Sequence, residues 1–162
     1  MKTAIVYYSL NGNTEYAANE ISNILGADLI PIKPVKAYAD KGFRKFLWGG
    51  KSVFMGETPE LQPYEFSASD YDIVIIGTPV WASSFSPPIR TFVEENRAAL
   101  QSKELAVFTC FSGGGAEKAI EKLRSFIDTD DFTAKLILVD PKTKPDTANA
   151  GKIKAFCSAL SE

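Results

Sequence analysis

The chain has 162 residues, a length that suits one domain with a sizeable hydrophobic core. Its 18 basic and 20 acidic residues give a net charge of -2 without any dense Lys/Arg run, which argues against a nucleic-acid partner. The sequence contains no histidine, so Ser-His and Cys-His catalytic pairs and imidazole metal sites are excluded.

Cysteine usage and the N-terminal sequence bear on the cellular compartment. Cys110 and Cys157 are too few for a disulfide framework, and neither has a metal-ligand neighbour at the usual spacing. No apolar run approaches the length of a membrane span, and Met1-Lys2 leads directly into a strand pattern instead of a signal peptide. We therefore expect a cytoplasmic protein with no membrane partner and no bound metal, present as a monomer or weak dimer.

Five apolar segments rich in β-branched residues predict strands. The third contains Ile73-Val-Ile-Ile76 without polar alternation, which is typical of a strand that is buried on both faces of a parallel sheet. In chain order the five segments are Thr3–Tyr8, Ala27–Ile32, Asp72–Gly77, Glu104–Cys110 and Ala134–Val139.

Four helical patterns follow strands of this series, over residues 17–25, 89–100, 116–127 and 153–160. The first stops at Gly26, a residue suited to a left-handed helix end, and the second starts after Pro87-Pro88, which is tolerated near a helix start. The alternation of strands and helices predicts an α/β fold, a doubly wound parallel sheet with right-handed crossovers and helices on both faces, as one domain over residues 1–162.

The connection from Pro34 to Asp70 is unusually long and predicts an inserted helix, or two half-helices, at one edge of the sheet. Its basic residues interleave with aromatic ones. One interpretation is a docking surface or partial lid for a redox partner or substrate, and the other is an amphipathic helix with its aromatic rings in the core. The residues concerned are Lys41, Phe43, Arg44, Lys45, Phe46, Leu47, Trp48, Lys51 and Phe54.

A polar loop, Ser9-Leu-Asn-Gly-Asn-Thr14, follows the first predicted strand and precedes the first predicted helix. In an open parallel sheet, ligands bind beyond the carboxyl ends of the strands. Gly12 allows a close backbone turn, Asn11 and Asn13 tolerate unusual dihedral angles, and the helix directs its positive end at the loop. The loop therefore predicts a phosphate site with neutral donors, although the same residues also serve as ordinary helix caps.

Two further loops follow strands at the same predicted edge. The segment Gly77-Thr-Pro-Val-Trp81 continues to Pro88 without a charged residue, and Trp81 suits stacking on a flat, apolar ligand or covering the edge of the core. Arg90 follows this loop and is a candidate for a ligand phosphate, although a salt bridge on the helix surface is commoner. The segment Ser112-Gly-Gly-Gly115 permits close backbone approach to a bound group, or serves as a hinge.

These three loops together resemble the flavin-binding loops of flavodoxins, and the resemblance covers essentially the whole chain. It implies a sheet of order 2-1-3-4-5 in the short-chain form and one noncovalent FMN. By this likeness the first loop holds the phosphate, the second flanks the isoalloxazine with Trp81 as the stacking ring, and the third meets the pyrimidine edge. The implied binding residues are Ser9, Leu10, Asn11, Gly12, Asn13, Thr14, Thr78, Pro79, Val80, Trp81, Ala82, Ser112, Gly113 and Gly114.

The sequence departs from the flavodoxin pattern in two places that affect redox behaviour. No glycine stands between Thr78 and Pro88, where many flavodoxins use the peptide group of a glycine to make a hydrogen bond to the one-electron-reduced flavin. The three loops also lack Asp and Glu, whereas electron-carrier flavodoxins are usually very acidic around the flavin. We therefore expect the reduction potential of the couple between half-reduced and fully reduced flavin to be less negative than in acidic flavodoxins.

Three functions are open on this scaffold. The leading interpretation is an electron carrier that works through FMN between a redox partner protein and a protein or small-molecule acceptor. The second is an NAD(P)H-dependent flavin or quinone reductase, and the third is a flavin-free binding module. No catalytic residue is predicted.

Other phosphate-binding and phosphate-processing families are excluded by their own motifs. Neither G-x-G-x-x-G nor G-x-x-x-x-G-K-[ST] follows the first strand. A C-x5-R phosphatase built on Cys110 would need arginine at position 116, where this chain has Ala116. A response-regulator receiver would need clustered acids where this chain has Ser9 and Thr78.

Overall fold

The computed structural model of the protein describes residues 1–39, 51 and 55–161. Within these ranges, every helix is too short or too polar to cross a lipid bilayer.

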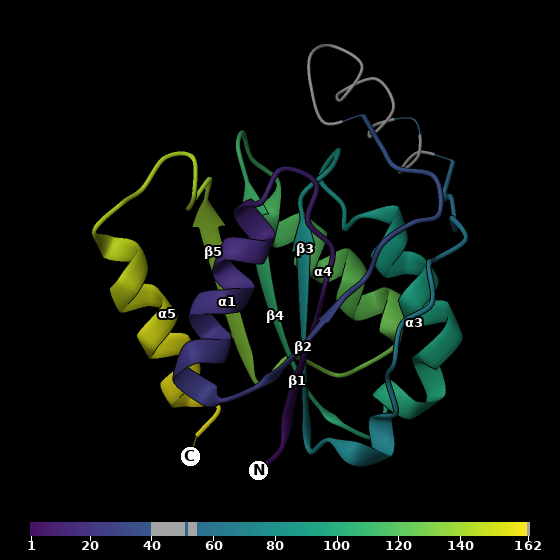
Figure 1. Ribbon diagram of the computed structural model, residues 1–162, viewed down its shortest axis with the longest axis horizontal. Coiled ribbons are helices and arrows are strands. Elements are labelled where there is room, and N and C mark those ends of the chain that lie inside the picture. Colours follow the sequence, from purple (N-terminus) through teal and green to yellow (C-terminus); the bar gives the residue numbers. More distant parts are fainter. Residues whose placement is uncertain (40–50, 52–54, 162) are drawn as a thin grey trace.

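The centre of the molecule is a five-stranded sheet in which each strand runs parallel to its neighbours (Figure 1). The strands are β1 (Thr3–Tyr7), β2 (Asp28–Pro31), β3 (Ile73–Pro79), β4 (Glu104–Phe111) and β5 (Ala134–Val139). Their spatial order is β2-β1-β3-β4-β5, so the predicted doubly wound α/β fold is confirmed. Because the chain reverses direction of winding after β2, the carboxyl ends of β1 and β3 lie side by side at the switch point.

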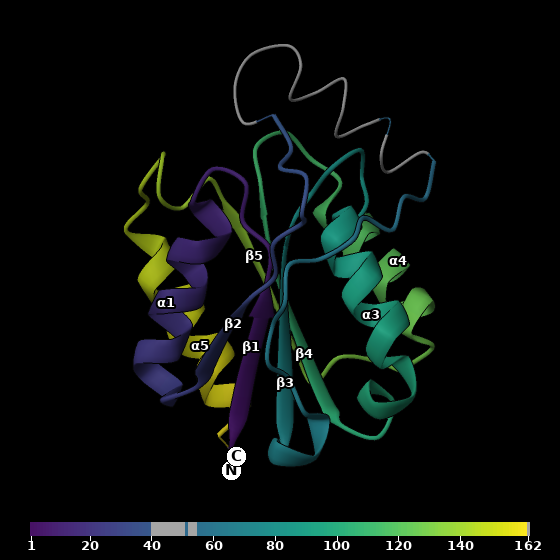
Figure 2. The same ribbon diagram turned by 45° about the vertical axis from the view of Figure 1, so that its right-hand side comes forward.

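Helices cover both faces of the sheet, as Figure 2 shows. On one face lie α1 (Asn13–Leu25) and α5 (Ala148–Ala159), and on the other lie α3 (Pro87–Leu100) and α4 (Ala116–Ile127). A short 3₁₀ helix, η1 (Ala68–Asp70), precedes β3. Each face has its own hydrophobic core.

The local signals in the sequence act as expected. The run from Ile73 to Ile76 is fully buried, because both faces of β3 are covered. Gly26 ends α1 in the left-handed conformation, with φ 64° and its N–H donating to the carbonyl of Ser22 at 2.8 Å. Pro87 and Pro88 are the first two residues of α3, where their missing N–H groups cost no helical hydrogen bond.

The connection between β2 and β3 is described only in part. Its two ends approach each other at an antiparallel bridge between Pro34 and Leu61. Apart from Lys51, the aromatic and basic residues of the predicted helix and docking surface lie outside the described residues.

Candidate functional site

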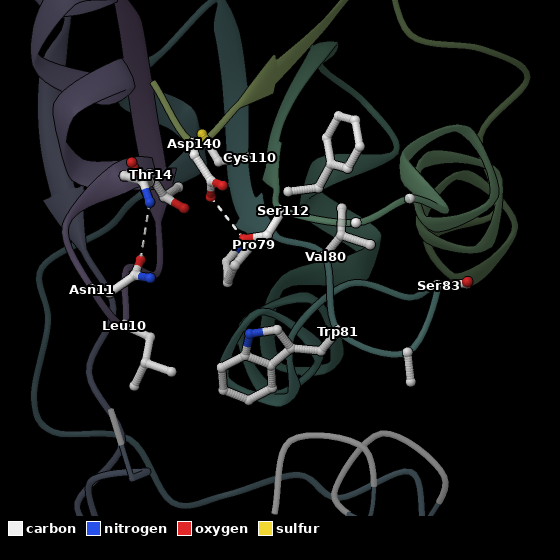
Figure 3. A pocket seen from close by; sticks show the side chains of 15 residues that line it. Leu10, Asn11, Thr14, Pro79, Val80, Trp81, Ser83, Cys110, Ser112 and Asp140 are labelled. Atoms are coloured by element: carbon white, nitrogen blue, oxygen red, sulfur yellow. Dashed lines mark hydrogen bonds between the residues drawn. The ribbon is translucent and has the colours of Figure 1, made fainter. Parts of the chain in front are cut away.

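A cavity of about 410 Å³ opens at the carboxyl edge of the sheet, among the loops that follow β1, β3, β4 and β5 (Figure 3). This volume is in the usual range for a small-molecule site. The lining residues are Leu10, Asn11, Asn13, Thr14, Pro79, Val80, Trp81, Ala82, Ser83, Cys110, Phe111, Ser112, Gly113, Gly114 and Asp140. The structure thus brings the three predicted loops together around one pocket.

All predicted binding residues line the cavity except Ser9, Gly12 and Thr78. These three hold its walls in shape. The hydroxyl of Ser9 accepts the N–H of Gly12 at 3.1 Å, and Thr78, fully buried, accepts the N–H of Ser86 at 2.9 Å. The side chains of Ser9 and Thr78 and the backbone of Gly12 therefore support the loops from behind the lining.

The loop after β1 turns at Gly12, which has φ 91° and caps the N-terminus of α1. The left-handed conformation falls on this glycine, where no Cβ opposes it, so the expected special dihedral angles of Asn11 and Asn13 are not required. The side chain of Asn13 instead makes a tertiary contact: its Oδ1 accepts the N–H groups of Lys142 and Thr143, at 2.9 and 3.2 Å. Asn13 therefore joins the loop after β1 to the loop after β5.

The loop after β3 contains a tight two-residue turn built without glycine. Trp81 and Ser84 exchange two backbone hydrogen bonds of 2.9 Å, and the residues between them, Ala82 and Ser83, have φ values of 48° and 54°. A left-handed conformation costs a residue with a Cβ roughly 1–2 kcal/mol, so this wall of the pocket is strained.

Gly115 explains how the loops after β3 and β4 approach each other. It has φ 83° at the start of α4, and a methyl group built on it would lie 2.4 Å from Oγ of Ser83. By contrast, methyl groups built on Gly113 and Gly114 would meet nothing within 4 Å. Gly115 is thus needed for packing, whereas Gly113 and Gly114 face open space in the pocket wall.

Trp81 is held by two tyrosines. Its ring centroid lies 5.7 Å from that of Tyr8 and 5.2 Å from that of Tyr38, with interplanar angles of 86° and 79°. Such edge-to-face contacts are favourable for aromatic rings and fix their orientation. The indole of Trp81 packs against the core and also lines the cavity, where Leu10 extends nearby (Figure 3). Its stacking on a flat ligand stays a prediction.

The pocket also contains a carboxylate that none of the three predicted loops supplies. Asp140 is only 5% exposed, and its Oδ1 accepts the hydroxyl hydrogen of Ser112 at 2.7 Å (Figure 3). Its other oxygen pairs with Nζ of Lys144 at 3.1 Å. The three expected loops contain no acid, but the pocket does, because Asp140 directly follows β5. The available signal in the sequence was the position of Asp140 directly after the fifth predicted strand, because that strand also ends at this edge of the sheet.

Cys110, at the end of β4, lines the pocket beside Thr14 and Asp140. Burial raises the pKa of its thiol to about 12. The thiol is therefore protonated at neutral pH and is a poor nucleophile. The second cysteine, Cys157, is buried in the core on α5, as expected, and both cysteines are free.

Arg90 does not line the cavity. Its guanidinium carbon lies 4.9 Å from the ring centroid of Phe85 and 4.5 Å from that of Phe126. Within the described residues, Arg90 thus makes cation–π contacts with the loop before α3 and with α4, in place of the expected ligand phosphate or surface salt bridge. Among the residues that the structure describes, no cluster of His, Cys, Asp or Glu is suited to a metal ion.

Comparisons with known proteins agree with this geometry. The sequence model of the family described as Flavodoxin matches residues 2–150. The chain is also similar to a flavoprotein from Lactobacillus acidophilus NCFM solved in complex with FMN, with a TM-score of 0.73 at 22% identity over 86% of this chain and 93% of the other.

Two further structures are similar over nearly their full lengths. A candidate flavoprotein from Bacteroides eggerthii DSM 20697 has a TM-score of 0.74 at 25% identity, covering 99% of this chain and 98% of that one. The two-electron reduced flavodoxin of Megasphaera elsdenii has a TM-score of 0.54 at 21% identity, covering 94% and 98%. These likenesses establish the fold.

Proposed function

Because the chain belongs to the flavodoxin family, we propose that its pocket binds one FMN noncovalently and that the protein transfers electrons through this flavin. FMN is the ligand named for the similar Lactobacillus acidophilus protein. The partners would be an electron-donating reductase and a protein or small-molecule acceptor.

The observation that carries this proposal is the division of the pocket into two chemically different ends. At one end, Asn11, Asn13 and Thr14 of the loop after β1 line the pocket at the N-terminus of α1, and a helix N-terminus suits a phosphate. At the other end Trp81 and Leu10 offer apolar surface to a flat ring. A phosphorylated molecule with a large planar ring system fits both ends.

The residues present fit FMN in their donor types as well. Thr14 and Asn11 supply neutral polar groups beside the N-terminus of α1, and the open wall at Gly113 and Gly114 leaves backbone groups accessible to the polar edge of the ring. When bound, FMN supplies the redox chemistry by accepting and donating one or two electrons. The chain itself binds and orients the ring, excludes water on the Trp81 side and sets the electrostatic field.

The field in the pocket combines three uncharged loops with one buried carboxylate. Asp140 disfavours added negative charge on the flavin, but the ammonium of Lys144 partly offsets it. We therefore keep the expectation of a reduction potential less negative than in flavodoxins with a strongly acidic rim, with Asp140 as the residue that lowers it. A couple as negative as in those proteins would contradict this.

The visible absorption spectrum, followed by addition of NADH and then NADPH, tests the proposed function. An electron carrier would show the flavin bands and would be reduced at a useful rate only when a reductase is present. Steady oxidation of NAD(P)H by the purified protein would instead identify an NAD(P)H-dependent flavin or quinone reductase. A colourless protein that takes up no added FMN would favour a flavin-free binding module.

A further inference from the structure

The loop after β5 packs directly on the loop that we assign to the phosphate. Asn13, the first residue of α1, holds it there, because its side-chain oxygen accepts two successive backbone N–H groups, those of Lys142 and Thr143. A side chain of this fourth loop can therefore reach the N-terminus of α1.

Lys142 makes this approach. A methyl group built on Gly12 would lie 2.8 Å from its Nζ and 3.3 Å from its Cδ, so the lysine side chain occupies the space that the missing Cβ leaves. Gly12 is the N-terminal cap of α1. The ammonium group thus lies against the backbone of the loop, at the positive end of the helix.

A cation in this position is electrostatically unfavourable in the free protein. The N-terminus of a helix carries a partial positive charge and favours anions. In the described part of the chain, Lys142 takes part in none of the ion pairs, not even with Glu15 in the first turn of α1. An anion bound at the helix end would remove the repulsion between the ammonium group and the helix.

The other lysine of the same loop has a different role. Lys144 pairs with the buried Asp140, at 3.1 Å. The loop after β5 therefore carries one lysine that neutralises a pocket carboxylate and a second, Lys142, whose charge is directed at the phosphate loop.

We propose that Lys142 binds the phosphate of FMN and supplies the positive charge that the loop after β1 lacks. This inference rests on the proposed function, because it assigns one further residue to the same ligand. The phosphate then contacts neutral donors of the loop after β1, among them Asn11 and Thr14, and one ammonium group from a separate loop. The lysine would favour FMN over riboflavin, which has the same ring system without the phosphate.

Titration of the wild-type apoprotein and of Lys142→Gln with FMN and with riboflavin tests the proposal. We expect Lys142→Gln to weaken FMN binding roughly tenfold, the size of one charge-assisted contact, and to leave riboflavin binding unchanged. The difference between wild type and variant should shrink at high ionic strength. Lys154→Gln removes the same charge from the exposed face of α5 and should change neither affinity.

Two results would overturn the assignment of Lys142. One is an equal loss of FMN and riboflavin affinity with a lower melting temperature, which would show that Lys142 only stabilises the loops. The other is an unchanged preference of Lys142→Gln for FMN. Failure of the proposed function would look different, because the wild-type protein itself would then bind neither flavin.

Discussion

Ser112 donates its hydroxyl hydrogen to Oδ1 of Asp140 over 2.7 Å, and this bond joins the loop after β4 to the loop after β5 inside the pocket. The contact fixes a buried carboxylate beside the residues that we assign to the polar edge of the flavin. Its consequence is electrostatic, since a fixed negative charge in a poorly solvated site opposes reduction of a bound cofactor.

Replacement of Asp140 by asparagine should therefore raise the reduction potential of bound FMN. The amide keeps the shape and can still accept the hydrogen bond from Ser112, so the change is mainly one of charge. The shift should be on the order of 59 mV for each tenfold change in the relative affinity for oxidised and one-electron-reduced flavin. A redox titration measures it, with Asp146→Asn, an exposed site beyond the pocket lining, as the control. An unchanged reduction potential in Asp140→Asn would contradict the proposal that this carboxylate lowers the potential of bound FMN.

Replacement of Ala82 by glycine should stabilise the protein by about 1 kcal/mol, because φ is 48° at this position and glycine lacks the Cβ that opposes it. For a chain of this length the melting temperature should rise by roughly 2–4 °C. The same substitution at Ala98, an exposed position inside α3, should instead destabilise by about 1 kcal/mol. Thermal unfolding compares the two, and equal effects would contradict the strained turn.

Replacement of Gly114 by alanine should weaken FMN binding without changing stability beyond about 0.5 kcal/mol. The added methyl group meets no protein atom within 4 Å, so it only fills space that the ligand is expected to use. In contrast, Gly115→Ala places the methyl group 2.4 Å from Oγ of Ser83 at a φ of 83°, and should lower the melting temperature. Reversed results for the two variants would show that the wrong glycines were assigned to the pocket.

Stability should fall in alkali in part because of the buried thiols, together with Tyr8 and Tyr64, whose pKa values burial also raises. Burial raises the pKa of Cys110 to about 12 and that of Cys157 to about 11, from an ordinary value of 9.0. Each contribution is complete below pH 9 and is lost as the pH rises toward the folded-state pKa, at up to about 1.4 kcal/mol per pH unit. Urea titrations from pH 8 to 12 measure the slope.

The two thiols can be separated by variants. Cys110→Ala should reduce the fall of unfolding free energy with pH between pH 9 and about pH 12. Cys157→Ala should reduce it only between pH 9 and about pH 11. Identical slopes in both variants and the wild type would show that other groups govern the alkaline loss of stability.

Much of the fold was predictable because its signals are local. The buried run from Ile73 to Ile76, the glycine that ends α1 and the prolines that begin α3 each specify an element by backbone geometry or burial alone. The strand order 2-1-3-4-5 came from the family resemblance and is confirmed. The three loops of the pocket were predictable because parallel strands end at one edge.

The rest of the site depends on contacts between residues far apart in the sequence. The approach of Lys142 to Gly12 and the bond from Ser112 to Asp140 arise from the packing of the loop after β5, which has no recognisable binding motif. The sequence also could not show that Ser9 and Thr78 bond to the backbone of their own loops and not to a ligand. A hydroxyl group suits a ligand and a backbone N–H equally well.

Fluorescence titration of the wild-type apoprotein and of Trp81→Ala with FMN tests directly whether the pocket binds one flavin against the indole of Trp81. We predict saturation at one FMN per chain in the wild type, and at least roughly tenfold weaker binding with a shifted flavin spectrum in the variant, because the supported indole ring is lost. Trp81→Phe should recover part of the affinity, since a smaller aromatic ring remains. A wild-type protein that binds no FMN, or a Trp81→Ala variant with unchanged affinity and spectrum, would contradict the account.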